Sequence, residues 1–112
     1  MELMNECQVG GKAAYLAAVA AMDAAIALEN VRSAVANRAS GVAQCWATHA
    51  LEAAQAASNY SACAEGEAAS LPPYGLGENA RIIATAARRA ANSAQADAME
   101  AVSMAQSITV RA

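Results

Sequence analysis

Alanine occupies 35 of the 112 positions, and this preference restricts the possible folds more than any other feature of the chain. Alanine is the strongest helix former and is depleted in β-strands, which favour β-branched and aromatic side chains. The chain has one tryptophan, three tyrosines and no phenylalanine. Because 57% of the residues are hydrophobic and 15% are charged, the composition is also unlike that of a disordered chain. The sequence therefore predicts an alanine-rich all-α protein with a single domain over residues 1–112.

The strongest interruption of the helical pattern lies between Ser70 and Gly77. Two prolines and two glycines in this stretch cannot continue a helix, so we expect a loop at residues 69–77. The hydrophobic pattern on either side repeats with helical periodicity. We therefore expect an antiparallel three-helix bundle. Its helices should lie near residues 12–38, 41–67 and 78–109.

Two weaker breaks complete this division. Gly10–Gly11 should separate a frayed N-terminal piece, residues 1–11, from the first helix. Near the second break, Ser40 can cap a helix and Gly41 can end one, although no proline enforces a stop. Apolar positions also recur every seven residues across Gly41. The alternative is therefore one long helix over residues 12–66, forming a helical hairpin with the last helix.

Hydrophobic periodicity assigns a core-facing stripe to the second and third helices. In the second helix the expected stripe is Val42, Trp46, His49, Ala53, Ala56, Tyr60 and Cys63. In the third it is Ile83, Ala87, Ala90, Ala94, Ala98, Ala101, Ala105 and Ile108. Trp46 should be the largest single contributor to the core.

The first helix is apolar on nearly every side. Large residues on two of its sides are Tyr15, Leu16, Val19, Met22, Ile26, Leu28, Val31 and Val35. A helix of this kind is normally buried nearly all round. We therefore expect it to be sandwiched by the other two helices or by a second subunit. Because each alanine buries little area, a monomeric core would be thin, which favours a homo-oligomer.

The net charge of −3 provides no electrostatic attraction to nucleic acid or anionic lipid. The segment Ala13–Leu28 is short for a membrane span and contains Asp23, so we expect no membrane insertion. The start of the chain lacks a secretory signal pattern. Three widely spaced cysteines do not form a disulfide framework and predict free thiols in the cytoplasm.

Cys45 and His49 form the most suggestive chemical pair in the sequence. Residues separated by four positions share one helix face, and thiolate and imidazole are donors for zinc or copper. A full site would need further donors, such as Glu52 or a methionine from another helix. The methionines available are Met22, Met99 and Met104, which we otherwise expect to fill gaps in the core. The competing and preferred interpretation makes Cys45 and His49 buried core residues, with no metal or other cofactor.

The sequence favours a non-enzymatic protein. A nucleophilic Cys45–His49 dyad would lack an evident oxyanion hole, and no other histidine is present. Three arginines, Arg81, Arg88 and Arg89, lack interleaved aromatic residues and more simply pair with acids across the bundle. We therefore expect neither catalysis nor nucleic-acid binding.

The loop at residues 69–77 is the strongest candidate for a binding surface. Leu71, Tyr74 and Leu76 are apolar residues on a proline-stiffened turn, where such side chains often contact partners. The equal alternative is that the loop folds back over the end of the bundle. The favoured function is a protein–protein interaction module, such as a small accessory, inhibitor or immunity-type protein. A metal- or cofactor-binding bundle and a self-assembling structural subunit are the alternatives.

Overall fold

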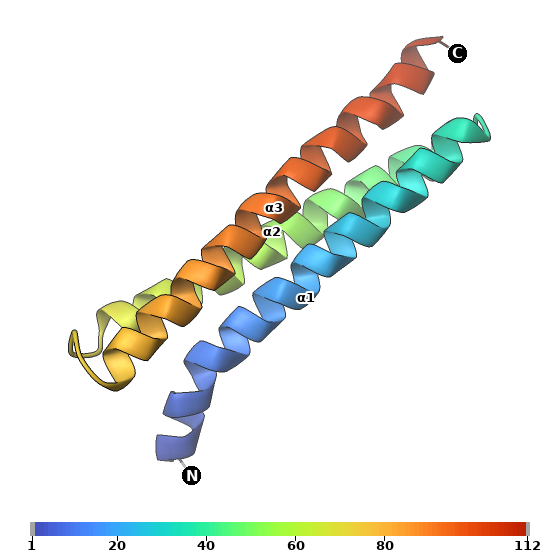
Figure 1. Ribbon diagram of the computed structural model, residues 1–112. Helices are drawn as coiled ribbons and strands as arrows, with labels where there is room; N and C mark the ends of the chain where they lie inside the picture. Colours follow the sequence, from blue (N-terminus) through green and yellow to red (C-terminus); the bar gives the residue numbers. More distant parts are fainter. Residues whose placement is uncertain (1, 112) are drawn as a thin grey trace.

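Three long helices joined by two short connections make up the chain (Figure 1). The computed structural model describes the backbone of residues 2–111 and the side chains of residues 11–108. The helices are α1 (Glu2–Ala36), α2 (Ser40–Ala69) and α3 (Leu76–Arg111). They run up, down and up, so α2 is antiparallel to both neighbours, and each helix packs against the other two. The predicted all-α three-helix bundle is confirmed.

The turn between α1 and α2 is closed by a specific set of backbone hydrogen bonds. The amide of Ala39 donates to the carbonyl of Ala34 at 2.8 Å, and the amide of Arg38 donates to the carbonyl of Val35 at 3.0 Å. Arg38 itself is left-handed, with φ 56°. This combination is the Schellman motif that ends many helices. The alternative of a single helix over residues 12–66 is therefore wrong.

The residues expected to make the weaker breaks do not make them. Ser40 and Gly41 both lie inside the first turn of α2, whose N-cap is Ala39. An alanine side chain cannot accept a hydrogen bond from the helix amides, so backbone geometry alone starts α2. The backbone of α1 also stays helical through Gly10–Gly11, so no break separates residues 2–11 from the rest of the helix. Fraying of residues 1–11 stays a prediction.

The core of the bundle is built almost entirely from alanine. Among the side chains described, every buried hydrophobic residue other than Leu28 and Val31 is an alanine. Each helix contributes a seam of small residues that recurs in alternating steps of three and four. In α1 the seam is Ala13, Ala17, Ala20, Ala24, Ala27, Val31 and Ala34. In α2 it is Ala43, Ala47, Ala50, Ala54, Ala57, Ser61, Ala64 and Ala68. In α3 it is Ala84, Ala87, Ala91, Ala94, Ala98, Ala101 and Ala105.

The expected stripe of α2 has the correct period but the wrong phase. The observed seam lies one residue further along the chain at nearly every position, which leaves Val42, His49 and Cys63 exposed. In α3 most of the expected stripe is buried, although Ile83 is exposed and Ala84 takes its place. The small size of the alanine side chain explains this choice of face. A seam of methyl groups lets two helices approach more closely than a seam of large side chains.

Several large side chains expected in the core therefore lie outside it. Trp46 packs against the main core cluster but is only half-buried, so it is not the centre of the core. Met22 and Met99 are exposed by 63% and 65%, whereas Met104 is half-buried against the core. On α1, Tyr15 and Ile26 are exposed as well. The expectation that the other two helices would enclose α1 is wrong, because they cover one side of it.

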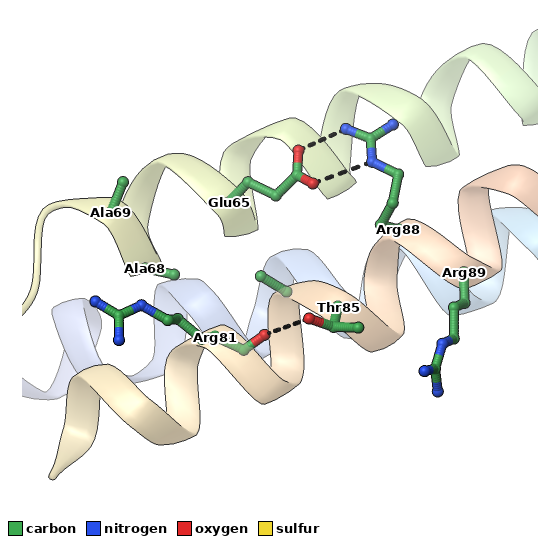
Figure 2. Close-up of a pocket in the computed structure, with 8 residues that line it drawn as sticks. Glu65, Ala68, Ala69, Arg81, Thr85, Arg88 and Arg89 are labelled. Atoms are coloured by element: carbon green, nitrogen blue, oxygen red, sulfur yellow. Dashed lines mark hydrogen bonds and ion pairs between the residues drawn. The ribbon is translucent and has the colours of Figure 1, made fainter. Parts of the chain in front are cut away.

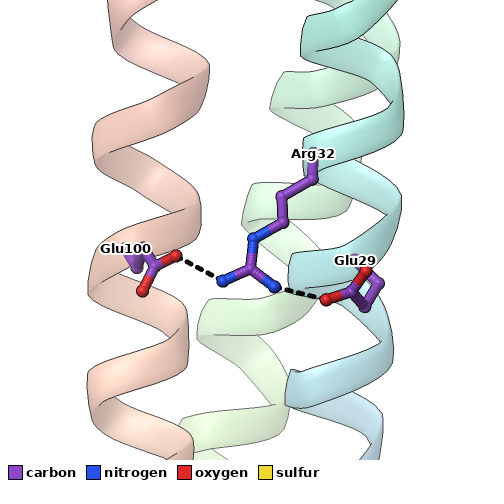
Figure 3. Close-up of polar contacts among 3 residues, drawn as sticks. All are labelled: Glu29, Arg32 and Glu100. Atoms are coloured by element: carbon purple, nitrogen blue, oxygen red, sulfur yellow. Dashed lines mark hydrogen bonds and ion pairs between the residues drawn. The ribbon is translucent and has the colours of Figure 1, made fainter.

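Surface ion pairs connect the helices outside the alanine seams. Arg32 on α1 donates to Glu29 one turn earlier and to Glu100 on α3, the latter at 2.7 Å (Figure 3). These hydrogen bonds, the one to Glu100 foremost, raise the pKa of the Arg32 guanidinium. All three side chains are well exposed, so these pairs contribute little to the stability of the fold.

One seam position contains a polar group that the core does not accommodate. Ser61 is fully buried, and its hydroxyl has no hydrogen-bond partner among the described residues. We expect Ser61→Ala to raise the free energy of unfolding by about 1–3 kcal/mol, because an unsatisfied buried hydroxyl is removed. Urea denaturation followed by circular dichroism measures the change. Ser58→Ala, at a half-buried position outside the seam, is the control and should stay within about 0.5 kcal/mol of wild type. A loss of stability in Ser61→Ala would contradict this account.

The left-handed residue of the first turn offers a second test of the fold. An L-residue other than glycine is disfavoured at the φ of Arg38. Arg38→Gly should therefore stabilise the bundle by about 0.5–1 kcal/mol, after the added flexibility of the unfolded chain is subtracted. Arg89→Gly, in the exposed interior of α3, should instead cost up to about 1 kcal/mol. Thermal unfolding of both variants would show opposite shifts, and shifts of the same sign would refute the assignment.

Candidate partner-binding loop

The connection between α2 and α3 begins with a well-bonded helix end. The amide of Ser70 donates to the carbonyls of Gly66 and Glu67, both at 3.2 Å, and its hydroxyl donates to Glu67 at 2.8 Å. The amide of Leu71 then donates to the carbonyl of Ala68 at 3.3 Å. Pro72 has no amide hydrogen, so the helix cannot continue beyond this point.

The return into α3 depends on two glycines. Gly75 has φ 61°, a conformation that glycine adopts without strain. Gly77 is buried, and a Cβ atom placed on it would collide with the carbonyl oxygen of Pro72. The amide of Gly77 also donates to the carbonyl of Tyr74 at 3.1 Å. The loop therefore packs closely onto the first turn of α3, and two prolines restrict its remaining freedom.

This fixed backbone leaves two apolar side chains largely exposed. Tyr74 is 71% exposed and Leu76 is 66% exposed, whereas Leu71, at 38%, is mostly covered. The side chains of Tyr74 and Leu76 therefore do not fold back over the end of the bundle, as the alternative interpretation of the sequence required. Partner binding by Leu71, Tyr74 and Leu76 stays a prediction, but the geometry leaves these groups available for it.

A shallow, open depression of about 390 Å³ lies beside the loop, between the end of α2 and the start of α3 (Figure 2). Arg88 and Glu65 form a two-bonded ion pair across it, with contacts of 2.5 and 3.1 Å. The hydrogen bonds from Arg88 lower the pKa of the Glu65 carboxyl. Arg89 points away from Glu65, and neither it nor Arg81 has an acidic partner among residues 11–108. The expected pairing of the arginine cluster with acids thus holds for one of its three members.

Cys45 and His49 lie on the exposed side of α2. Both side chains are exposed, so the expectation that they are core residues is wrong. The imidazole of His49 meets the ring of Trp46 edge to face, with centroids 5.6 Å apart and an interplanar angle of 87°. Among the described residues, no group of three or more histidine, cysteine, aspartate or glutamate side chains gathers where it could hold a metal ion. The pair therefore offers at most two of the donors that a closed zinc site needs.

The outward side of α1 is left exposed by the other two helices, whereas the sequence left open whether they or a second subunit would cover it. Within α1, Gly11–Ala36 is long and apolar enough to cross a membrane by length and composition, with a hydropathy of 1.4. Only 33% of its most apolar window is buried inside the bundle. Core helices of soluble proteins pass the same test, so this finding alone assigns no membrane role. The all-round apolar pattern was visible in the sequence, but which side would remain open was not.

No family model, curated protein or solved structure matches the chain. The function of the chain is therefore inferred from the exposed groups of the bundle and their geometry. The loop between α2 and α3 is the most specific of these surfaces, because hydrogen bonds, prolines and a close glycine contact all fix its shape.

The close contact at Gly77 can be tested directly. Gly77→Ala should destabilise the protein by about 1–3 kcal/mol, because the added methyl group forces the loop away from the start of α3. Gly66→Ala is a matched control, since a Cβ atom there meets nothing within 4 Å. That variant should be neutral or more stable by up to about 1 kcal/mol, as alanine is the better helix former. Urea denaturation of both proteins measures the difference, and equal stabilities would refute the proposed contact.

Proposed function

We propose that the protein is a non-enzymatic interaction module that binds another protein through Leu71 and Tyr74 of the loop and Leu76 at the start of α3. The observation that carries this proposal is the outward display of two largely exposed apolar side chains, Tyr74 and Leu76, on a backbone that is already fixed. Binding by a preordered loop loses little conformational entropy. Tyrosine side chains are also among the residues that most often dominate binding energies at protein interfaces.

The surroundings of the loop suggest the chemistry of the partner. An apolar pocket would accept Tyr74 and Leu76, while Arg81, five residues after Leu76 on α3, has no acidic partner among the described residues. A partner with a carboxylate at the rim of its pocket would complement this cation. Such a rim charge would mainly raise the rate of association and its dependence on salt.

The alternative functions have less support. Metal or cofactor binding would rest on Cys45 and His49, and no third donor of the kinds considered joins them in the part of the chain described. Two exposed cysteines without disulfide partners, Cys45 and Cys63, support action in a reducing compartment, and we propose the cytoplasm.

Affinity capture with quantitative mass spectrometry tests the proposed function. The wild-type protein, immobilised in extract from the cells that naturally express it, should retain a specific partner. The double variant Tyr74→Ala, Leu76→Ala should retain at least about tenfold less, since hot-spot truncations cost more than 2 kcal/mol. Ile82→Ala on α3 is the control, because Ile82 is 64% exposed but lies outside the loop. Circular dichroism should show that all variants are folded. Equal retention by the double variant would refute binding through the loop.

A further inference from the structure

We propose that the outward side of α1 is a homodimer interface, where it packs against α1 of a second copy of the chain. This outer face is defined by six apolar residues that lie opposite the alanine seam of α1. Its members are Tyr15, Ala18, Val19, Met22, Ala25 and Ile26. The surface is separate from the loop between α2 and α3, so this inference goes beyond the proposed partner-binding function.

Helical spacing gathers these residues into one continuous strip. Tyr15, Met22 and Ile26 are separated by seven and four positions, which places them on the same side of the helix. They are exposed by 67%, 63% and 54%. On the opposite side, Ala17 and Ala24 are completely buried against α2 and α3. The bundle thus uses one side of an apolar helix and leaves the other side in water.

The total surface area of the chain exceeds that of a compact monomer, partly because the bundle is elongated, with extents of 56 × 24 × 14 Å. A compact monomer of this mass, 11.3 kDa, exposes about 5,700 Å². The chain exposes 6944 Å², a surplus of about 1,200 Å² over that value. A stable interface of ordinary size removes about 800 Å² from each partner. The surplus is therefore large enough to supply one such interface per chain.

The shape and charge of the outer face suit a second copy. Large residues such as Tyr15 and Met22 alternate with the small residues Ala18 and Ala25, so an antiparallel copy can place its large side chains over the small ones. The face itself contains no charged residue. Lys12 and Asp23 beside it have opposite signs, and Glu29, one turn beyond Ile26, is paired with Arg32 of its own helix. A twofold arrangement therefore brings no large charge of one sign together.

A second copy fits this face better than a lipid surface does. Interfacial membrane helices combine an apolar face with a polar face rich in lysine and arginine. Here Lys12 is the one basic residue between Gly11 and Ala25, the chain carries a net charge of −3, and the polar side expected of such a helix is replaced by the alanine seam. These features give no electrostatic attraction to an anionic bilayer.

Sedimentation equilibrium on the full chain tests the dimer. The wild-type protein should sediment as a dimer of the 11.3 kDa chain at roughly 100 micromolar. Met22→Glu should raise the dissociation constant at least about tenfold, since each subunit then brings an unpaired carboxylate into the interface. Met99→Glu is the matched control, because Met99 is equally exposed but lies on α3, and its dimer should be unchanged. Circular dichroism should show both variants to be as helical as wild type.

Three outcomes would overturn the inference. The first is a wild-type protein that remains monomeric at this concentration. The second is an equal loss of association in Met22→Glu and Met99→Glu, which would place the contact elsewhere. The third is a monomer that floats with phosphatidylcholine vesicles and loses this property in Met22→Glu, which would assign the face to lipid. The Tyr74→Ala, Leu76→Ala variant changes the loop and leaves the outer face of α1 intact. Loss of partner capture by this variant would therefore leave the dimer proposal unchanged.

Discussion

Contact between alanine methyl groups is the interaction on which the rest of this structure depends. Each methyl group removes little apolar area from water, so stability must come from close approach of long helices over many residues. Alanine contributes a second favourable term, because it is the best helix former and loses no side-chain rotamer entropy on folding. A bundle of this kind combines a thin core with helices that are intrinsically favourable, and among the described seam residues only Val31 and Ser61 are not alanine.

The same close packing sends large apolar side chains to the outside. A seam of methyl groups has no space for Trp46 or Met22, which lie at its edge or on the opposite side of their helices. The usual arrangement, with large apolar residues inside, is therefore partly reversed. This reversal supplies the two surfaces proposed for binding, namely the loop with Tyr74 and Leu76 and the outer face of α1. Both present apolar side chains without loosening the core.

The two connections hold the helices in register by different means. The first uses backbone bonds around Arg38, where a left-handed residue other than glycine is tolerated because the turn satisfies the carbonyls at the end of α1. The second uses the close approach of Pro72 to Gly77. Ion pairs from Arg32 to Glu100 and from Arg88 to Glu65 then join neighbouring helices along the outside.

The sequence by itself determined the helical class, the position of the loop near residues 69–77 and the heptad-like period of the seams. Composition and prolines decide these features locally, whatever the helices pack against. Only the tertiary structure decided the phase of the seams, which placed Ala43 inside and Val42 outside. Alanine is small and weakly apolar enough to fit either environment, so periodicity cannot distinguish the two faces of an alanine-rich helix. The burial of Gly77 and the open side of α1 were decided in the same way, because both depend on how closely whole helices approach one another.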